Sequence, residues 1–194
     1  MGLEATAYLI GMIKLDLGAA LDQTKNVHAF TSAMAFYQGA MQAIRHLQEW
    51  GHEIPQDVLT LSEQARSKVF DPARLTEVLD YGRKLAAGNF ATYDTAYRAM
   101  LWIDGVPTLT REAGIELPEG YGGIVNEMSS SGLPRLLRYA QDSIQNDPGL
   151  AKRRFRNAVE LREKIVGRGV EMPQDVEALF HETESMVSGL EGKL

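Results

Sequence analysis

The chain has 194 residues, of which 44% are hydrophobic, so it can bury the core of a globular protein and is not a disordered tail. Its 20 basic and 26 acidic residues give a net charge of -6, which argues against a wholesale nucleic-acid-binding protein. Cysteine is absent from the sequence, which excludes disulfides, thiolate metal sites and thiol nucleophiles and suits a reducing cytoplasm.

Apolar residues recur at three- and four-residue spacing along most of the chain, which is typical of amphipathic helices. The first predicted helix, 3–21, contains Lys14 and Asp16, so we expect it to be amphipathic and not to span a membrane. The other predicted helices are 30–50, 58–69, 75–85, 90–102, 133–144, 155–166 and 176–190. Since no run alternates as a strand does, we predict an all-α fold, a multi-helix bundle.

Helix-start signals occur at two places between these segments. In FDPAR, Asp71 is expected to cap a helix whose first residue is Pro72, and Asp147 with Pro148 in NDPG repeats that arrangement. The glycine- and serine-rich stretch EGYGGIVNEMSSSG, 119–132, lacks the Lys-Ser/Thr pair of a phosphate-binding loop. We predict that it is a flexible connection.

One octapeptide occurs twice, as GHEIPQDV at 51–58 and as GVEMPQDV at 169–176. A glycine in the left-handed conformation ends a helix, and a proline begins one. Gly51 and Pro55, like Gly169 and Pro173, therefore predict a corner between two helices.

The similarity extends beyond these corners, because a shift of 118 residues also superposes Ala40 on Ala158, Leu61 on Leu179 and Val69 on Val187. A weaker third copy is GIELPEGYGGI at 114–124. We predict an internally repeated αα-hairpin. The expected organisation is a single all-α domain, 1–194, with two pseudo-repeats at about 1–70 and 133–190 joined by a helical and loop segment, 71–132.

His46, Glu49 and His52 form H-x-x-E-x-x-H, a spacing that could bring metal-binding side chains together. The equivalent positions of the second copy are Lys164, Gly167 and Val170, so the repeat does not carry the ligands twice. We expect ordinary histidines, no metal site and no cofactor.

Arg45 and His52 also resemble the R-x(4–6)-H motif of HEPN-type ribonucleases, which are small helical bundles that dimerise to form their site. The resemblance covers eight residues, 45–52, and includes His46. It implies that Arg45 binds the scissile phosphate and that His52 acts as general acid or base. In that family the motif lies near the start of a late helix, whereas here it ends an early one.

The segment 135–168 contains nine basic and four acidic residues, a net charge of +5. Because the whole chain has a net charge of -6, the residues outside this segment have a net charge of -11. Lys152, Arg153, Arg154 and Arg156 come early in the helix that Asp147 and Pro148 are predicted to begin, where the helix dipole disfavours positive charge. They are the expected binding residues for an anionic partner, although Glu160 and Glu163 could also balance them on a solvated face.

Two function classes follow from these features. The first is a non-catalytic helical interaction or regulatory module, which binds a protein or another anionic partner through Lys152, Arg153, Arg154 and Arg156. Protein partners or self-association are expected, nucleic acid is an alternative through 135–168, and no membrane is involved. The second class is a small helical enzyme acting on a phosphate-containing substrate through Arg45, His46 and His52. We favour the interaction module.

Overall fold

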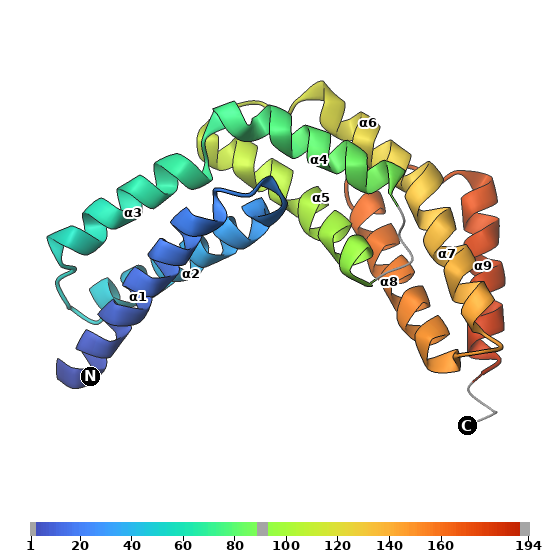
Figure 1. Ribbon diagram of the computed structural model, residues 1–194, viewed down its shortest axis with the longest axis horizontal. Helices are drawn as coiled ribbons and strands as arrows, with labels where there is room; N and C mark the ends of the chain where they lie inside the picture. Colours follow the sequence, from blue (N-terminus) through green and yellow to red (C-terminus); the bar gives the residue numbers. More distant parts are fainter. Residues whose placement is uncertain (1–2, 89–92, 191–194) are drawn as a thin grey trace. The chain divides into compact units, whose positions relative to one another are not determined.

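The computed structural model describes residues 3–88 and 93–190, and every regular element in these residues is a helix (Figure 1). The α-helices are α1 Leu3–Gln23, α2 Phe30–Glu49, α3 Gln56–Val69, α4 Leu75–Ala87, α5 Tyr93–Ala113, α6 Glu119–Glu127, α7 Leu133–Ser143, α8 Pro148–Val166 and α9 Gln174–Ser188. Two 3₁₀ turns, η1 Val27–Ala29 and η2 Pro72–Arg74, and one π-helical turn, η3 Met128–Gly132, lie between them. The predicted all-α fold is confirmed.

Two predicted segments differ most from the structure. The helix predicted over 90–102 continues to Ala113 as α5, and its predicted first residues, 90–92, lie outside the described residues. The flexible connection predicted over 119–132 is wrong, because α6 and η3 cover this stretch and continue into α7. Tyr121, Ile124, Val125 and Met128 are buried at three- and four-residue spacing, so the burial of one helical face outweighs the weak helix propensity of glycine and serine.

Both predicted helix-start signals are confirmed. The Asp71 carboxylate accepts a 3.0 Å hydrogen bond from the backbone N–H of Ala73, at the start of η2. The Asp147 carboxylate accepts a 2.8 Å hydrogen bond from the backbone N–H of Leu150, at the start of α8. Each aspartate satisfies a backbone donor that has no acceptor within its own helix.

The two octapeptides adopt the same local conformation. Gly51 and Gly169 have φ of 77° and 78°, which is the left-handed region that ends a helix at glycine. Pro55 and Pro173 precede α3 and α9 with identical torsions, φ of -57° and ψ of 142°. The stretch at 114–118 has a similar conformation, with φ of 71° at its glycine and φ of -68° with ψ of 143° at its proline.

The chain divides into two compact units. The first contains Met1–Val78 and Thr108–Glu116, and the second contains Leu79–Pro107 and Leu117–Leu194. Two of the divisions fall within α4 and α5 and the third falls between α5 and α6, and each unit is described by itself. That the whole chain forms a single domain stays a prediction.

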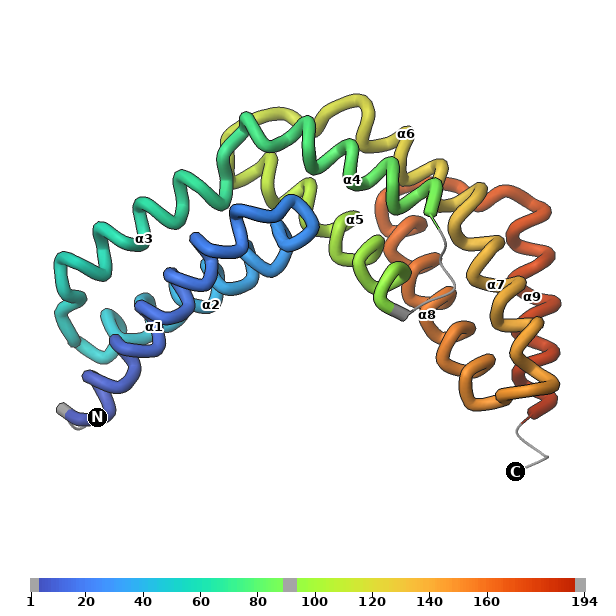
Figure 2. The backbone as a smooth tube through the Cα atoms, in the orientation of Figure 1, coloured from blue at the N-terminus to red at the C-terminus, as the bar shows by residue number. Residues whose placement is uncertain are grey.

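In the first unit, α1, α2 and α3 pack against one another, and successive helices run in opposite directions (Figure 2). Lys14 of α1 forms a 2.6 Å ion pair with Asp57 of α3, and Arg66 of α3 donates a 3.0 Å hydrogen bond to the Glu112 carbonyl. The largest apolar side chains of this core come from all three helices, from the residue after α3 and from the end of α5: Ile13, Leu17, Phe30, Met34, Tyr37, Ile44, Leu47, Val58, Phe70 and Leu109.

In the second unit, α7 packs against both α8 and α9. The Trp102 and Tyr121 rings stack with their centroids 5.4 Å apart, and Trp102 is fully buried. The core of this unit is otherwise mainly aliphatic: Ile103, Val106, Met128, Leu133, Leu136, Leu137, Leu161 and Ile165.

Candidate functional site

The basic residues predicted to bind a partner lie in the first half of α8. This helix begins at Pro148, directly after its aspartate cap, and buries Ala151, Ala158 and Leu161 at helical spacing. Side chains on one face of the helix therefore point to the core, and the neighbouring side chains point to solvent. The four predicted residues divide between these two environments.

Arg154 faces its own unit. Its guanidinium donates a 2.9 Å hydrogen bond to the Tyr139 carbonyl and a short one to the Ser143 hydroxyl, and it lies 5.7 Å from the centroid of the Tyr139 ring. Both acceptors belong to the last turns of α7, near the helix end at which the helix dipole favours a cation. Arg154 thus joins α8 to α7.

Four other basic residues of 135–168 also have partners within the second unit. Arg135 donates to the Ala87 and Gly88 carbonyls at 2.8 and 2.9 Å. Arg162 forms a 2.7 Å ion pair with Glu177 and lies over the Phe180 ring, 5.2 Å from its centroid. Lys164 and Arg168 both pair with the same carboxylate, that of Asp104.

The Asp104 carboxylate shows the electrostatic effect of these pairs. Burial alone would raise its pKa, but hydrogen bonds and charge from Lys164 and Arg168 outweigh burial and hold the pKa below its usual value. Asp104 is 60 residues from Lys164 in the sequence. Much of the positive charge of 135–168 is therefore used inside the chain.

Lys152, Arg153 and Arg156 differ from these residues, and we call the three together the α8 basic face. Arg153 and Arg156 are exposed and Lys152 is half-buried. Spacings of three and four residues place Arg156 beside the other two on the helix surface. Over residues 3–88 and 93–190, no acidic side chain forms an ion pair with any of the three.

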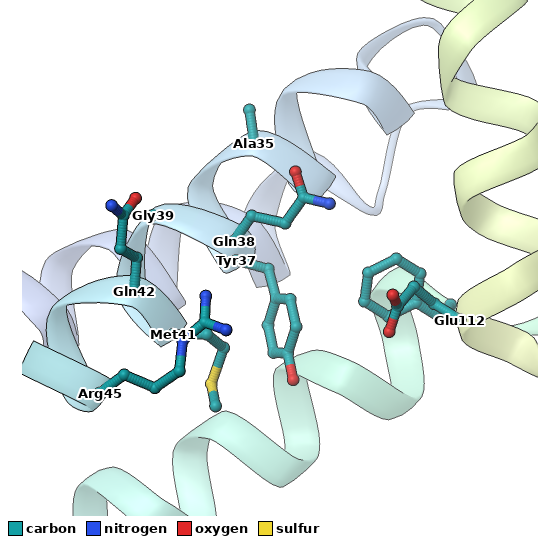
Figure 3. Close-up of a pocket in the computed structure, with 9 residues that line it drawn as sticks. Ala35, Tyr37, Gln38, Gly39, Met41, Gln42, Arg45 and Glu112 are labelled. Atoms are coloured by element: carbon teal, nitrogen blue, oxygen red, sulfur yellow. The ribbon is translucent and has the colours of Figure 1, made fainter. Parts of the chain in front are cut away.

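Arg45, one of the predicted catalytic residues, lines a hollow of about 650 Å³ on α2 in the first unit (Figure 3). Gln38, Gln42 and Arg45 project from one side of α2, and Glu112 lies across from them. The other lining residues are Ala35, Tyr37, Gly39, Met41 and Phe70. Because Gln38, Gln42 and Arg45 follow one another at four- and three-residue spacing, the sequence carried a signal for this polar face.

The Tyr37 ring packs edge-on against Phe70, with centroids 5.3 Å apart. Burial raises the pKa of its hydroxyl, Arg66 lowers it and Glu112 raises it, with a net increase above the usual value. Tyr37 is therefore a neutral hydrogen-bonding group at physiological pH. The hollow combines this hydroxyl with amides, one guanidinium and one carboxylate.

The two histidines predicted beside Arg45 do not line this hollow. His46 packs against Trp50, with ring centroids 6.0 Å apart, and His52 follows the corner glycine. Among the described residues, no group of three or more His, Cys, Asp or Glu side chains is placed to hold a metal ion. The same residues include no helix both long enough and apolar enough to cross a membrane.

Comparisons of the chain with protein-family models, with curated proteins and with solved structures found no match.

Proposed function

We propose that this protein is a non-catalytic interaction module that binds an acidic protein segment through the α8 basic face. The observation that supports this function is the contrast within one basic segment. Arg135, Arg154, Arg162, Lys164 and Arg168 have hydrogen-bond or ion-pair partners in the chain. Among the described residues, Lys152, Arg153 and Arg156 have no such partner, and neither does Arg138 of α7. Like charges at three- and four-residue spacing on a helix repel one another, so an external anion would stabilise this row of cations.

An acidic protein segment fits this face better than a nucleic acid does. Proteins that follow a nucleic-acid backbone use on the order of six to ten phosphate contacts, and the α8 basic face offers three cations. The net charge of -6 also repels a long polyanion, while a short acidic segment meets mainly the local positive charge. The absence of cysteine supports a cytoplasmic location for this interaction.

The interaction module is also proposed to consist of repeated αα-hairpins. Three corners support this, because each places a left-handed glycine four residues before a proline. The residue four positions before each glycine is buried, and so is the residue three positions after each proline. These residues are Leu47, Thr110 and Ile165 before the glycines, and Val58, Tyr121 and Val176 after the prolines.

The enzyme alternative draws its support from Arg45, which lines the hollow on α2 with Tyr37 and Glu112. The HEPN-type hypothesis needs Arg45 and His52 to act on one phosphate, and His52 is not among the lining residues. A ribonuclease assay with single-stranded RNA tests this hypothesis. RNA cleavage that is lost in both Arg45→Ala and His52→Ala, but retained in Arg156→Ala, would favour the enzyme over the interaction module.

The proposed function is tested by reversing the charge of the α8 basic face. We expect the Lys152→Glu, Arg153→Glu, Arg156→Glu variant to bind a fluorescein-labelled oligoglutamate peptide at least about tenfold more weakly than wild type, as measured by anisotropy. Wild-type binding should weaken with salt, and the variant should lose most of that dependence. Circular dichroism would verify that the variant is folded.

The matched control is Lys68→Glu, Lys84→Glu, Arg111→Glu, which changes the net charge by the same amount on other helices. It should weaken binding much less, because a local contact and not overall charge is proposed. Equal losses in the two variants would contradict the proposal. The proposal would also be contradicted if wild type bound single-stranded RNA more tightly than the peptide, since that result identifies a nucleic-acid-binding surface.

A further inference from the structure

The outward face of α1, in the first unit, is apolar. On the inward side, Ile13 and Leu17 are fully buried in the core. On the opposite side, Tyr8 and Leu15 have exposed fractions of 69% and 68%. A helix that is apolar on both sides is normally covered on both sides, so the exposed face of α1 points to an additional contact.

Two glycines lie on the same outward face, within the body of the helix. Gly11 and Gly18 are exposed, and a Cβ atom added to either would meet no atom within 4 Å. Glycine weakens a helix relative to alanine, and nothing in the described parts of the chain requires its small size at these two positions. Glycines of this kind are used where another backbone or a large side chain approaches closely.

The order of large and small residues on this face is symmetric. Tyr8, Gly11, Leu15 and Gly18 follow one another at spacings of three, four and three residues, which is the a/d pattern of a coiled-coil seam. Tyr8 is five residues before Ile13 and Gly18 is five residues after it. Gly11 and Leu15 are two residues before and two residues after Ile13, so each large residue has a glycine as its mirror position.

This symmetry indicates which partner binds to the outward face of α1. If a second α1 lay antiparallel across the first, with the two-fold axis beside Ile13, Tyr8 of one copy would face the Gly18 region of the other. Leu15 would likewise face Gly11. A two-fold axis repeats each contact between a large residue and a glycine, because an isologous interface must be complementary to itself. An interface with an unrelated partner does not require this symmetric order of large and small residues.

From these observations we infer that the outward face of α1 binds a second copy of this chain in an antiparallel, two-fold helix pair. Side chains at Tyr8 and Leu15 act as the knobs, and the glycines of the partner helix provide the space that receives them. At each end of the seam, Glu4 of one copy would face Asp22 of the other, and the 2.6 Å ion pair of Asp22 with Lys25 would reduce the repulsion between these two carboxylates. The proposed interface does not use the α8 basic face.

The dimer should be reversible and of moderate affinity, because one helix pair buries less surface than a standard protein interface. Sedimentation velocity over a range of concentrations in the micromolar region tests this expectation on the full chain. We expect a monomer–dimer equilibrium for wild type. A chain that stays monomeric throughout this range would overturn the inference, and so would a monomer whose α1 face binds neutral lipid vesicles.

Substitutions on the seam separate dimerisation from folding. Leu15→Glu places a carboxylate opposite the partner helix and should weaken the dimer at least about tenfold, while helicity measured by circular dichroism stays unchanged. Met186→Glu is the matched control, because Met186 is an exposed apolar residue of α9, with an exposed fraction of 42%, and lies outside the proposed interface. The proposed seam would be contradicted if Leu15→Glu left the dimer intact, or if Met186→Glu weakened the dimer as strongly as Leu15→Glu does.

Substitution of the two glycines should change monomer stability and dimer affinity in opposite directions. Gly11→Leu with Gly18→Leu should raise the thermal stability of the monomer, since leucine favours a helix and both positions are open. The same change should weaken the dimer at least about tenfold, because the space for the partner's side chains is lost. If the double variant dimerised as wild type does, the glycines would not be contact positions.

Helix direction can be tested by cross-linking, because the natural chain contains no cysteine. In the antiparallel pair the two copies of residue 8 lie about 15 Å apart along the helix axes, whereas residue 8 of one copy faces residue 18 of the other. Mixing Tyr8→Cys chains with Gly18→Cys chains under mild oxidation should therefore give the mixed disulfide dimer in excess over both like dimers. An excess of the two like dimers would indicate a parallel pair and would overturn the proposed arrangement.

Discussion

The Tyr121 hydroxyl donates a 2.7 Å hydrogen bond to the backbone carbonyl of Ile103. In a regular helix this carbonyl would accept from the N–H of the residue four positions later, and that residue is Pro107, within α5. Proline has no N–H, so the side chain of α6 supplies the donor that α5 lacks. The same tyrosine stacks on Trp102, which holds its ring in place.

This arrangement predicts how Tyr121 and Pro107 are coupled. Tyr121→Phe keeps the ring and leaves the Ile103 carbonyl without the hydroxyl donor, so the free energy of unfolding should fall by about 1–3 kcal/mol. In a Pro107→Ala background the backbone N–H of residue 107 can take over, and the same substitution should cost less. Urea unfolding of the four chains measures this coupling. Equal costs in both backgrounds would show that the hydroxyl does not replace the missing donor.

The alkaline stability of the protein should also depend on Tyr121. Burial raises the pKa of its hydroxyl to about 12, above the value of roughly 10 expected in the unfolded chain. Because the pKa is raised in the folded state, the neutral Tyr121 hydroxyl contributes stability that is fully present below about pH 10 and is lost as the pH rises toward 12. Between about pH 9 and pH 11, wild type should therefore lose more stability than Tyr121→Phe does. Parallel pH profiles of the two chains would contradict this assignment.

Local signals made much of the fold predictable, while contacts between distant residues did not show in the sequence. Asp71, Asp147 and the corner glycines Gly51 and Gly169 act within a few residues of themselves, so their roles could be inferred from spacing alone. The helix at α6 was missed because three of its nine residues are glycine and serines follow it in η3. The burial of Tyr121 and its apolar neighbours explains why this stretch is nevertheless helical.

The candidate site was predictable to a similar extent. The positive charge of α8 can be counted in the sequence, but the partners of Lys164 and Arg168 cannot, because Asp104 lies about sixty residues away. The sequence contained a signal that the Arg154 side chain points inward. Ala151 and Ala158 lie three residues before and four residues after it, and small apolar residues at that spacing mark the buried face of a helix.

Gly82 in α4 should be far less tolerant of substitution than its helical setting indicates. A Cβ atom there would lie 2.2 Å from Cζ2 of Trp102, which is fully buried and has no room to move away. Gly82→Ala should therefore destabilise the protein by about 2 kcal/mol or more. In α2, Gly39 has no atom within 4 Å of an added Cβ, so Gly39→Ala should be neutral or stabilising by up to about 1 kcal/mol. Chemical denaturation of both variants measures the difference, and equal effects would contradict it.

The corner glycines should tolerate residues according to how well each adopts a positive φ. Gly51 has φ of 77° and open space around it, so backbone conformation and not crowding limits substitution. Gly51→Val should cost about 1–2 kcal/mol or more, and Gly51→Asn should cost less, because asparagine enters the left-handed region more readily. The same order is expected at Gly169, with φ of 78°. Thermal melts in which valine and asparagine behave alike would show that the corner relaxes to another conformation.

Adjacent arginines of α8 should have separable roles. Arg154 donates hydrogen bonds to the Tyr139 carbonyl and the Ser143 hydroxyl, and its neighbour Arg153 is exposed. Hydrogen bonds from a charged group typically stabilise more than neutral ones, so Arg154→Ala should lower the free energy of unfolding by about 1–3 kcal/mol. Arg153→Ala should change it by less than about 0.5 kcal/mol, as is usual for a surface position.

Binding of the oligoglutamate peptide should follow the opposite order. Arg153→Ala removes one of three cations from the α8 basic face and should weaken binding a few-fold, with a smaller salt dependence than wild type. Arg154→Ala should bind as wild type does when measured well below its melting temperature, because its guanidinium is directed toward α7 and not toward a partner. Anisotropy titrations of the two variants, with unfolding curves recorded under the same conditions, measure both quantities. Binding lost in Arg154→Ala and kept in Arg153→Ala would move the partner contact from the exposed face of α8 to the junction of α7 and α8.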